Sequence, residues 1–204
     1  VSLVQDAVTE VRGNTVITRE GHEVEVDVLA LATGFETLQI LGPMEIVGRS
    51  RRTLRDTWGE EDARAYLGIT VPDFPNLFVL YGPNTTTGHG GSAFLTTEMQ
   101  ARYVTRLLVE MVDTGIASVD VRPEVHEAFD QEVTEALNGL VYTHPKVHGY
   151  YRNKNGRIIG SNPWEYIEYW RRTLTPDLSE YETRPAAVPA SAVAGGINDN
   201  EETH

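Results

Sequence analysis

Near its start the chain alternates apolar and polar residues in three short runs separated by turn residues. The runs "LVQDAVTEV", "TVITR" and "VEVDVLALA" fall within residues 3–32, divided around Arg12-Gly13-Asn14 and Glu20-Gly21-His22. The third run becomes wholly apolar from Leu29 to Ala32, as a strand does on entering a covered interior. The pattern predicts a three-stranded meander that ends at Thr33-Gly34.

The middle of the chain reads as a strand, a glycine-rich loop and a long helix. Residues 76–81, "NLFVLY", form a short apolar run typical of strands buried in parallel sheets. The helix predicted after the loop has Ser92 as N-cap and Gly115 as the residue after its end. Its apolar positions recur at helical spacing and predict a buried face made of Phe94, Thr97, Ala101, Val104, Leu108 and Met111.

One strand and two helices are predicted after this helix. "ASVDVRPE" predicts a strand, and residues 124–139 a helix. A last helix is predicted from Pro163 to about Thr173, with an apolar stripe of Trp164, Ile167, Trp170 and Leu174. Residues 36–75 are irregular and long for a plain connection, so we expect a functional excursion or a crossing between domains.

Composition narrows the possible partners. The 204 residues include 17 basic and 30 acidic side chains, for a net charge of −13, which argues against nucleic acid or an anionic membrane surface. The chain has no cysteine, which excludes disulfides, thiolate zinc sites and cysteine nucleophiles. Its six histidines lack the spacing of metal ligands, so no metal site is expected.

The sequence also suggests a setting. No apolar run approaches the roughly 20 residues of a membrane helix, and no leader pattern opens the chain, so we expect a cytoplasmic protein. The chain begins without methionine and already inside a strand-like pattern. We therefore expect it to be the C-terminal piece of a longer protein.

The loop from Gly82 to Ser92 is the first candidate site. Its eleven residues hold four glycines, one proline, three threonines, one asparagine and one histidine. Between a strand and a helix, such a loop can present backbone N–H groups and the positive end of the helix dipole to a ligand. The spacing matches neither phosphate-binding glycine fingerprint. A turn that is glycine-rich for steric reasons alone remains the alternative.

The second candidate is "DVLALATGF", residues 27–35. A buried strand that ends in Ala-Thr-Gly lets the chain turn where a side chain would obstruct a cofactor or a neighbouring strand. The tripeptide alone is a weak signal. It becomes stronger when "FPNLFVLYGPN" follows some forty residues later.

These motifs carry a family resemblance. "DVLALATGFE", "YLGITVPDFPNLFVLYGPNT", "VYTHPKVHGYYRNKNGR" and "PWEYIEYWRRT" occur in order. Together they resemble the C-terminal part of the flavin-dependent Baeyer–Villiger monooxygenases, nearest to the 4-hydroxyacetophenone monooxygenase group. The resemblance runs from about residue 3 to 182. Ala-Thr-Gly-Phe is shared with related flavin monooxygenases, whereas the loop together with Tyr-Arg-Asn-x-x-Gly-Arg is more particular.

The resemblance implies an α/β fold: the C-terminal portion of a flavoprotein with two dinucleotide-binding domains, FAD and NAD(P), in which a β-meander precedes βα units. Residues 1–35 would end the NADP-binding domain, and 36–75 would form a crossover on the substrate side. Residues 76–182 would complete the FAD-binding domain, and 183–204 would be a disordered tail. The implied cofactors are FAD and NADP, bound by Thr33, Gly34, Gly82, Pro83, Asn84, Thr85, His89, Gly90, Gly91 and Ser92.

The resemblance also limits what this chain can do. The family's two glycine fingerprints, its Phe-x-Gly-x3-His-x3-Trp motif and its active-site arginine are absent from this sequence. No catalytic residue is therefore assigned. Trp58 is a candidate for the substrate pocket, with packing in a core equally open, and His89 could equally be a plain loop residue. Asn153 and Arg157 are expected to pin the C-terminal segment by hydrogen bonds.

The implied reaction is oxygen insertion from O2 into a small ketone, giving an ester or lactone at the expense of NADPH. The alternatives are a flavin monooxygenase that oxidises nitrogen or sulfur, or a non-catalytic remnant when the chain is isolated. We expect the isolated chain to be inactive. A homo-oligomer remains open.

Overall fold

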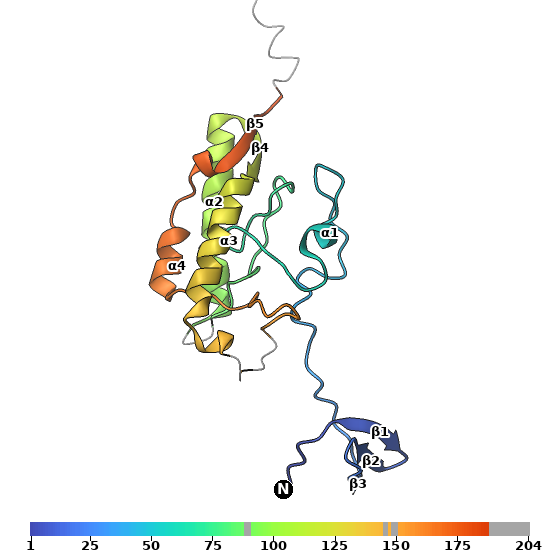
Figure 1. The fold of residues 1–204 in the computed structure, drawn as a ribbon. Helices are drawn as coiled ribbons and strands as arrows, with labels where there is room; N and C mark the ends of the chain where they lie inside the picture. The colour runs from blue at the N-terminus through green and yellow to red at the C-terminus, as the bar shows by residue number, and fades with distance from the viewer. Residues whose placement is uncertain (88–90, 145–146, 148–150, 188–204) are drawn as a thin grey trace, which may run out of the picture. The chain divides into compact units, whose positions relative to one another are not determined.

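We describe a computed structural model of the chain that covers residues 1–87, 91–144, 147 and 151–187. Contacts within the chain divide it into two compact units, residues 1–36 and residues 37–204. Each unit is described by itself, and Figure 1 shows the elements of both.

The first unit is the predicted meander. β1 (Val8–Arg12), β2 (Thr15–Thr18) and β3 (Glu23–Glu25) form an antiparallel sheet in the order β1-β2-β3. Gly13 makes the first turn with a φ of 62°, a conformation that glycine adopts without strain. The two tight turns follow from the turn residues seen in the sequence.

The prediction for the third strand was wrong in its second half. β3 ends at Glu25, where its pairing with β2 ends, and the apolar run up to Ala32 is not a strand. Val28, Leu31 and Phe35 are exposed. The described residues supply no neighbouring strand for this run, and an extended segment needs a hydrogen-bonded neighbour to be part of a sheet.

The second unit is built mainly from helices. α1 (Leu54–Trp58) lies in the irregular segment, α2 (Ala93–Thr114) follows the glycine-rich loop, and α3 (Pro123–Asn138) and α4 (Tyr166–Arg172) come after it. Two short 3-10 turns, η1 (Val141–Thr143) and η2 (Leu178–Glu180), complete the helical elements. None of the described helices is long and apolar enough to cross a membrane.

The ends of α2 confirm the sequence prediction. Ser92 is its N-cap, and Gly115 ends it in the left-handed conformation, with its N–H donating to the carbonyl oxygens of Met111 and Val112. The strand and helix after it are confirmed as β4 (Ile116–Val121) and α3. The last helix begins at Tyr166 rather than Pro163, and its stripe was wrong, because Tyr169 is buried and Ile167 is exposed.

Two further predictions were wrong. Residues 76–81 form no strand; Val79 is buried, and its N–H donates to the carbonyl oxygen of Ile69 at 2.8 Å in an irregular crossing. The disordered tail expected at residues 183–204 was wrong for its first residues, because β5 (Tyr181–Pro185) pairs antiparallel with β4, and residues 188–204 lie outside the described residues. This ladder, together with the buried Tyr181, whose hydroxyl is hydrogen-bonded to that of Tyr103 at 2.9 Å, orders residues that composition alone made look unstructured.

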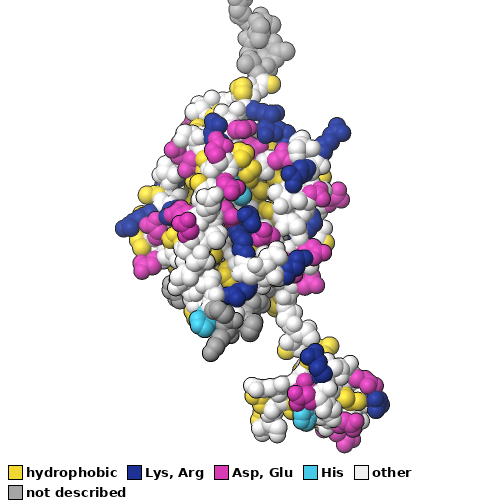
Figure 2. All heavy atoms as spheres, viewed as in Figure 1, with side chains coloured by type: hydrophobic (Ala, Val, Ile, Leu, Met, Phe, Trp, Pro, Cys, Tyr) yellow, Lys and Arg dark blue, Asp and Glu magenta, His cyan; other side chains and the backbone are white. Residues whose placement is uncertain are grey.

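One core joins α2, α3 and the β4–β5 pair, which lie together in Figure 1. Tyr103 and Leu107 of α2 meet Val119 and Val121 of β4 and Val133 of α3 in this cluster. A second cluster packs α1 against the segment that follows it, through Leu54, Trp58, Ala63, Ala65, Val71 and Phe74. Charged side chains of both signs cover the face seen in Figure 2.

The buried face of α2 differs from the predicted one, although Met111 is buried as predicted and Val104 packs against the core. Thr96, Met99, Gln100, Tyr103 and Leu107 are buried together with Met111. Phe94 and Leu108 are exposed instead. The periodicity identified an apolar stripe, but that stripe is not the face that packs in the core. The face that packs in the core carries polar groups whose hydrogen-bond partners lie in distant segments, and a count of apolar residues cannot reveal them.

Candidate functional site

The first half of the glycine-rich loop is buried and tied to a distant segment. Asn84 donates its N–H to the carbonyl oxygen of Ile159 at 2.8 Å, and its side-chain amide donates to those of Ile158 (3.0 Å) and Ser161 (3.2 Å). Asn84 has a φ of 57°, a region that asparagine tolerates better than most residues. The asparagine therefore holds the turn on residues 158–161.

Gly82 is required by close packing. A Cβ at this position would lie 2.3 Å from the carbonyl oxygen of Gly68, far inside contact distance. The hydroxyl of Thr85 donates to the carbonyl oxygen of Gly82 at 2.7 Å and closes the turn. Gly82, Pro83, Asn84 and Thr85 are all buried. At Gly82, this close contact supports the alternative that the loop is glycine-rich for steric reasons.

The second half of the loop leads into α2. The Ser92 N–H donates to the Tyr166 hydroxyl at 2.8 Å, and that hydroxyl donates to the Ser92 carbonyl oxygen at 2.6 Å. A Cβ on Gly91 would lie 2.0 Å from the Tyr166 ring. Tyr166 of α4 therefore sets the position of the loop where it enters the helix. His89 and Gly90, which we predicted to bind cofactor, lie outside the described residues.

A buried polar chain fixes the start of the loop. The Tyr81 N–H donates to the Gln100 side-chain oxygen at 2.6 Å, and the Gln100 amide donates to the Tyr169 hydroxyl at 2.8 Å. That hydroxyl donates to the carbonyl oxygen of Leu67 at 2.8 Å. Burial raises the pKa of Tyr169, so its hydroxyl stays protonated and able to donate. These three hydrogen bonds link the loop to α2, to α4 and to the turn at Leu67.

A cavity of about 290 Å³ opens beside this loop. Its walls combine backbone at two glycines with tyrosine, threonine and aliphatic side chains: Thr37, Leu38, Ile40, Tyr81, Gly82, Thr86, Tyr151 and Gly160. None of the described residues that line it carries a charged side chain. It suits the edge of a planar, largely uncharged ring better than a phosphate group.

The other predicted cofactor residues, Thr33 and Gly34, belong to the first unit. Gly34 has a φ of 84°, and a Cβ there would meet nothing within 4 Å. The glycine is therefore explained by its backbone conformation and not by close approach of a neighbour. Both residues are exposed.

Trp58, the candidate for the substrate pocket with core packing equally open, lies in a core cluster of this chain. Its side chain is 3% exposed in the second core cluster, and its indole N–H donates to the carbonyl oxygen of Arg64 at 2.8 Å. A buried indole with its polar group satisfied is a packing residue. Sequence reasoning had left this role equally open.

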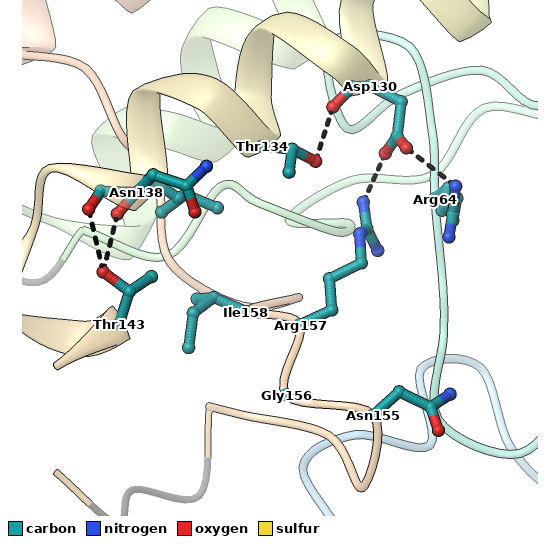
Figure 3. Close-up of a pocket in the computed structure, with 10 residues that line it drawn as sticks. Arg64, Asp130, Thr134, Asn138, Thr143, Asn155, Gly156, Arg157 and Ile158 are labelled. Carbon is teal, nitrogen blue, oxygen red and sulfur yellow. Dashed lines mark hydrogen bonds and ion pairs between the residues drawn. The ribbon is translucent and has the colours of Figure 1, made fainter. Parts of the chain in front are cut away.

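A second cavity, of about 420 Å³, lies between α3 and residues 155–158 (Figure 3). Asp130 accepts from both Arg64, at 2.8 Å, and Arg157 on its wall. Arg157 also donates to the Asp62 carboxylate at 3.2 Å. Because these two guanidinium groups are neutralised by two carboxylates, the described residues that line this cavity offer no free positive charge to an anion.

The same network confirms the structural role predicted for Asn153 and Arg157. The Asn153 amide donates to Asp62 at 3.2 Å, and its side-chain oxygen accepts the backbone N–H of Arg157 at 2.9 Å. The two residues pin the segment around residues 153–157 to the one around residue 62.

The structure also brings together one group that histidine spacing did not reveal. Single ligand atoms of Asp6, Glu20 and His22 lie within 4.8 Å of one another. Asp6 already accepts backbone N–H groups from Ala7 and Glu20, at 2.8 and 2.7 Å. The pKa of Asp6 is lowered first by a hydrogen bond from the Thr18 side chain and then by these backbone donors. The same hydrogen bonds explain why the three side chains lie together.

Known proteins resemble the chain over most of its length, although no protein-family model matches it. A Baeyer–Villiger monooxygenase of Streptomyces coelicolor is 31% identical over 205 residues, which cover 100% of this chain and 39% of that protein. An uncharacterized monooxygenase of Sinorhizobium fredii is 35% identical over 91% of this chain and 28% of its own length. These relatives are monooxygenases.

Solved structures show the fold. A steroid monooxygenase bound to NADP superimposes with a TM-score of 0.73 and 22% identity, covering 89% of this chain and 34% of that one. The protein OTEMO, in complex with FAD and NADP, superimposes with a TM-score of 0.73 and 23% identity, over 88% of this chain and 34% of that one. The fold class predicted from the sequence is confirmed, and the chain spans about a third of these proteins.

Sequence reasoning missed the residues that hold the loop. Gln100, Tyr166 and Tyr169 are scattered over 70 positions, and each lies in a stretch that reads as an ordinary amphipathic helix. The one available signal was a glutamine among the apolar positions of a long helix. A buried amide needs partners, and the start of the loop supplies one.

Proposed function

We propose that the chain is part of an FAD- and NADPH-dependent monooxygenase of the Baeyer–Villiger type, which inserts one oxygen atom of O2 into a small ketone. The observation that carries this proposal is 31% identity to a Baeyer–Villiger monooxygenase across the whole chain. The named relatives do not test the narrower placement in the 4-hydroxyacetophenone monooxygenase group, which we keep as a prediction. A cytoplasmic location is part of the same proposal.

The residues fit one wall of a flavin site. The cavity beside Gly82 has an uncharged, partly aromatic lining, which suits an isoalloxazine ring. The first backbone N–H groups of α2, at residues 93–95, have no partner among the described residues and can donate to a polar edge of a ligand. The predicted cofactor residues from Gly82 to Thr85 would then act by shaping the wall with their backbone.

Bound flavin, once reduced by NADPH, would supply the oxygen-activating chemistry. The part played by this chain is to position and to shield. Gln100 and Tyr169 hold the start of the loop through three hydrogen bonds, and Tyr166 holds its end. A loop held at both ends keeps one shape while the cofactor and the substrate bind, and water is excluded from the site.

The chain alone lacks the residues that would hold the cofactor's phosphates. No glycine fingerprint for a pyrophosphate occurs in its sequence, and the cavity is small and uncharged. We therefore propose that the isolated chain binds FAD weakly or not at all and has no activity. Stoichiometric flavin that stays with the chain through gel filtration would contradict this.

Product analysis tests the reaction type. The full-length protein that carries this chain is incubated with NADPH and, in parallel, with cyclic ketones, aryl ketones, tertiary amines and thioethers. The proposal predicts esters or lactones from at least one ketone. Oxidation of amines or thioethers alone would replace it with a nitrogen- or sulfur-oxidising flavin monooxygenase.

A further inference from the structure

Tyr151 reaches the cavity beside Gly82 from a hairpin, and that hairpin runs alongside the glycine-rich loop. The Ile159 N–H donates to the carbonyl oxygen of Tyr151 at 3.1 Å, which pairs the two arms of the hairpin. The arm that leads into Gly160 also meets the loop, because the Thr86 N–H donates to the carbonyl oxygen of Gly160 at 2.9 Å. Tyr151, Gly160 and the loop therefore form three neighbouring parts of one cavity wall.

Gly160 leaves the space that the Tyr151 ring occupies. A Cβ at Gly160 would lie 2.8 Å from Cδ1 of Tyr151 and 3.5 Å from its Cε1. The backbone itself does not require glycine here, since Gly160 is not in the left-handed region, whereas Gly156 in the same hairpin has a φ of 84° and open space around it. The ring of Tyr151 thus lies directly against the main chain of residue 160, as aromatic rings do when they cover a glycine on a neighbouring strand.

A second aromatic ring fixes the position of Tyr151. The rings of Tyr142 and Tyr151 meet edge to face, with centroids 6.1 Å apart and an interplanar angle of 73°. Tyr142 is itself held, because the Arg152 side chain donates to its carbonyl oxygen at 2.6 Å, and both tyrosines pack against the core shared by α2, α3 and β4. The ring at the cavity therefore has a defined position before any ligand binds.

The described lining of the cavity holds two aromatic side chains, Tyr81 and Tyr151. Tyr81 lies at the start of the loop, whereas Tyr151 comes from the distant hairpin. Gly82 and Gly160 add bare main chain, which a planar ligand can approach closely. Because aromatic rings prefer to contact other rings in offset or edge-to-face arrangements, the Tyr151 ring suits a planar, aromatic ligand.

We propose that Tyr151 contacts the flavin ring, and that Gly160 is the residue that seats Tyr151 for this contact. The inference rests on the proposed function, because it takes the planar ligand of this cavity to be the isoalloxazine ring. It gives the hairpin a part in the site beside that of the loop. The segment that Asn153 and Arg157 pin to Asp62 also brings an oxidisable phenol ring to the cofactor.

Fluorescence of the bound flavin tests the contact without any turnover. A tyrosine that touches a flavin quenches its fluorescence, because the phenol lends an electron to the excited ring, and phenylalanine has nearly the same shape but is much harder to oxidise. Tyr151→Phe and Tyr151→Leu are compared in the full-length protein that carries this chain. Tyr181→Phe is the control, since Tyr181 is a buried core tyrosine outside the lining of the cavity. The flavin fluorescence lifetime and the Kd for FAD are measured for each.

The expected result is a longer flavin lifetime in both Tyr151 variants and an unchanged lifetime in Tyr181→Phe. Tyr151→Leu should also bind FAD about fivefold more weakly, whereas Tyr151→Phe should stay within about twofold of the native Kd, because it keeps the ring contact. A protein that holds flavin but shows a native lifetime in Tyr151→Phe and a native Kd in Tyr151→Leu would overturn this inference alone. A protein that holds no flavin would contradict the proposed function as well.

A double variant tests the part of Gly160. Gly160→Ala should weaken FAD binding about as much as Tyr151→Leu, because the methyl group displaces the ring, and combining the two should add no further loss. Gly139→Ala, where a Cβ would meet nothing within 4 Å, is the matched control and should keep the native Kd. Additive losses, or a native Kd in Gly160→Ala, would overturn the role of Gly160 as the seat of the ring. If Gly160→Ala does not fold, the conservative Tyr151→Phe still decides whether the ring contacts the flavin.

Discussion

The side-chain amide of Asn84 donates to the carbonyl oxygen of Ile158 across 74 positions of sequence, at 3.0 Å. This bond and its companion to Ser161 attach the glycine-rich loop to the strand-like segment beneath it. The loop that we place beside a flavin is therefore part of the folded core of the second unit and has a shape before any ligand arrives.

Asn84→Ala should destabilise the chain by about 3 kcal/mol, because it removes two buried hydrogen bonds and places alanine at a φ of 57°. Asn84→Gly should cost about 1 kcal/mol less, since glycine accepts that φ. Urea unfolding measures both. Asn155→Ala, at an exposed position nearby, should change stability by less than about 0.5 kcal/mol. Equal effects at Asn84 and Asn155 would contradict the structure.

Gly82→Ala should be more damaging than its size suggests. The added methyl group would lie 2.3 Å from the carbonyl oxygen of Gly68, so the two crossing segments must separate, at a cost of about 3 kcal/mol. Gly139→Ala is the control, because its Cβ would meet nothing within 4 Å and its φ is −86°. It should raise stability by about 0.5 kcal/mol. Thermal unfolding compares the two; a harmless Gly82→Ala would refute the packing described.

Arg157 and Asp130 should be energetically coupled. Both side chains are largely buried, and Arg157→Gln or Asp130→Asn alone removes one charged partner while Arg64 or Asp62 still pairs with the group that remains, so each should cost about 2 kcal/mol. The double variant should cost about 1 to 2 kcal/mol less than the sum of the two. Lys154→Ala breaks the exposed pair with Glu60 and should cost under about 0.5 kcal/mol. Strict additivity of the Arg157 and Asp130 variants in urea unfolding would rule out a direct pair.

Asp120 should give the stability of the chain a specific pH dependence. Burial raises the pKa of this carboxyl, although Arg49 lies 3.2 Å away and opposes the shift. A carboxyl whose folded-state pKa is raised stabilises the fold below its unfolded pKa of about 3.8, and this contribution is lost as pH rises through the folded-state pKa. The difference in Tm between Asp120→Asn and the native chain should therefore shift in favour of the variant as the pH rises from about 4 to about 7.

The exposed Asp177 provides a control of opposite sign. Its pKa is lowered by hydrogen bonds from Ser179, so Asp177→Asn should lose Tm relative to the native chain as the pH rises toward the unfolded pKa of about 3.8, and the difference should then stay constant up to about pH 7. A relative Tm that is flat with pH for Asp120→Asn would show that Asp120 is not buried as described.

Local signals predicted the elements that depend on local chemistry. Ser92 and Gly115 mark the ends of α2, and turn residues divide β1 from β2, because caps and turns are decided within a few residues. Asn153 and Arg157 could likewise be predicted to hold their segment in place by hydrogen bonds, since both side chains are rich in donors.

What failed depended on partners that lie far along the sequence, or on faces that no described residue covers. Thr183 and Arg184 were predicted to begin a disordered tail, but they pair with Val119 and Ser118 of β4. Phe94 and Leu108 looked buried because the face is apolar, and they are exposed because no described residue covers it. Gln100 and Tyr166, which hold the candidate loop, contact it from 19 and 74 positions away. Such contacts leave no periodic trace in one sequence.

The flavin content of the full-length protein that carries this chain tests the central claim most directly. After purification, its absorbance spectrum is recorded, and NADPH is added without oxygen. The account predicts about one FAD per chain, with a flavin band that NADPH bleaches and that oxygen restores. A protein that retains no flavin, even after incubation with FAD, and oxidises no NADPH would contradict it.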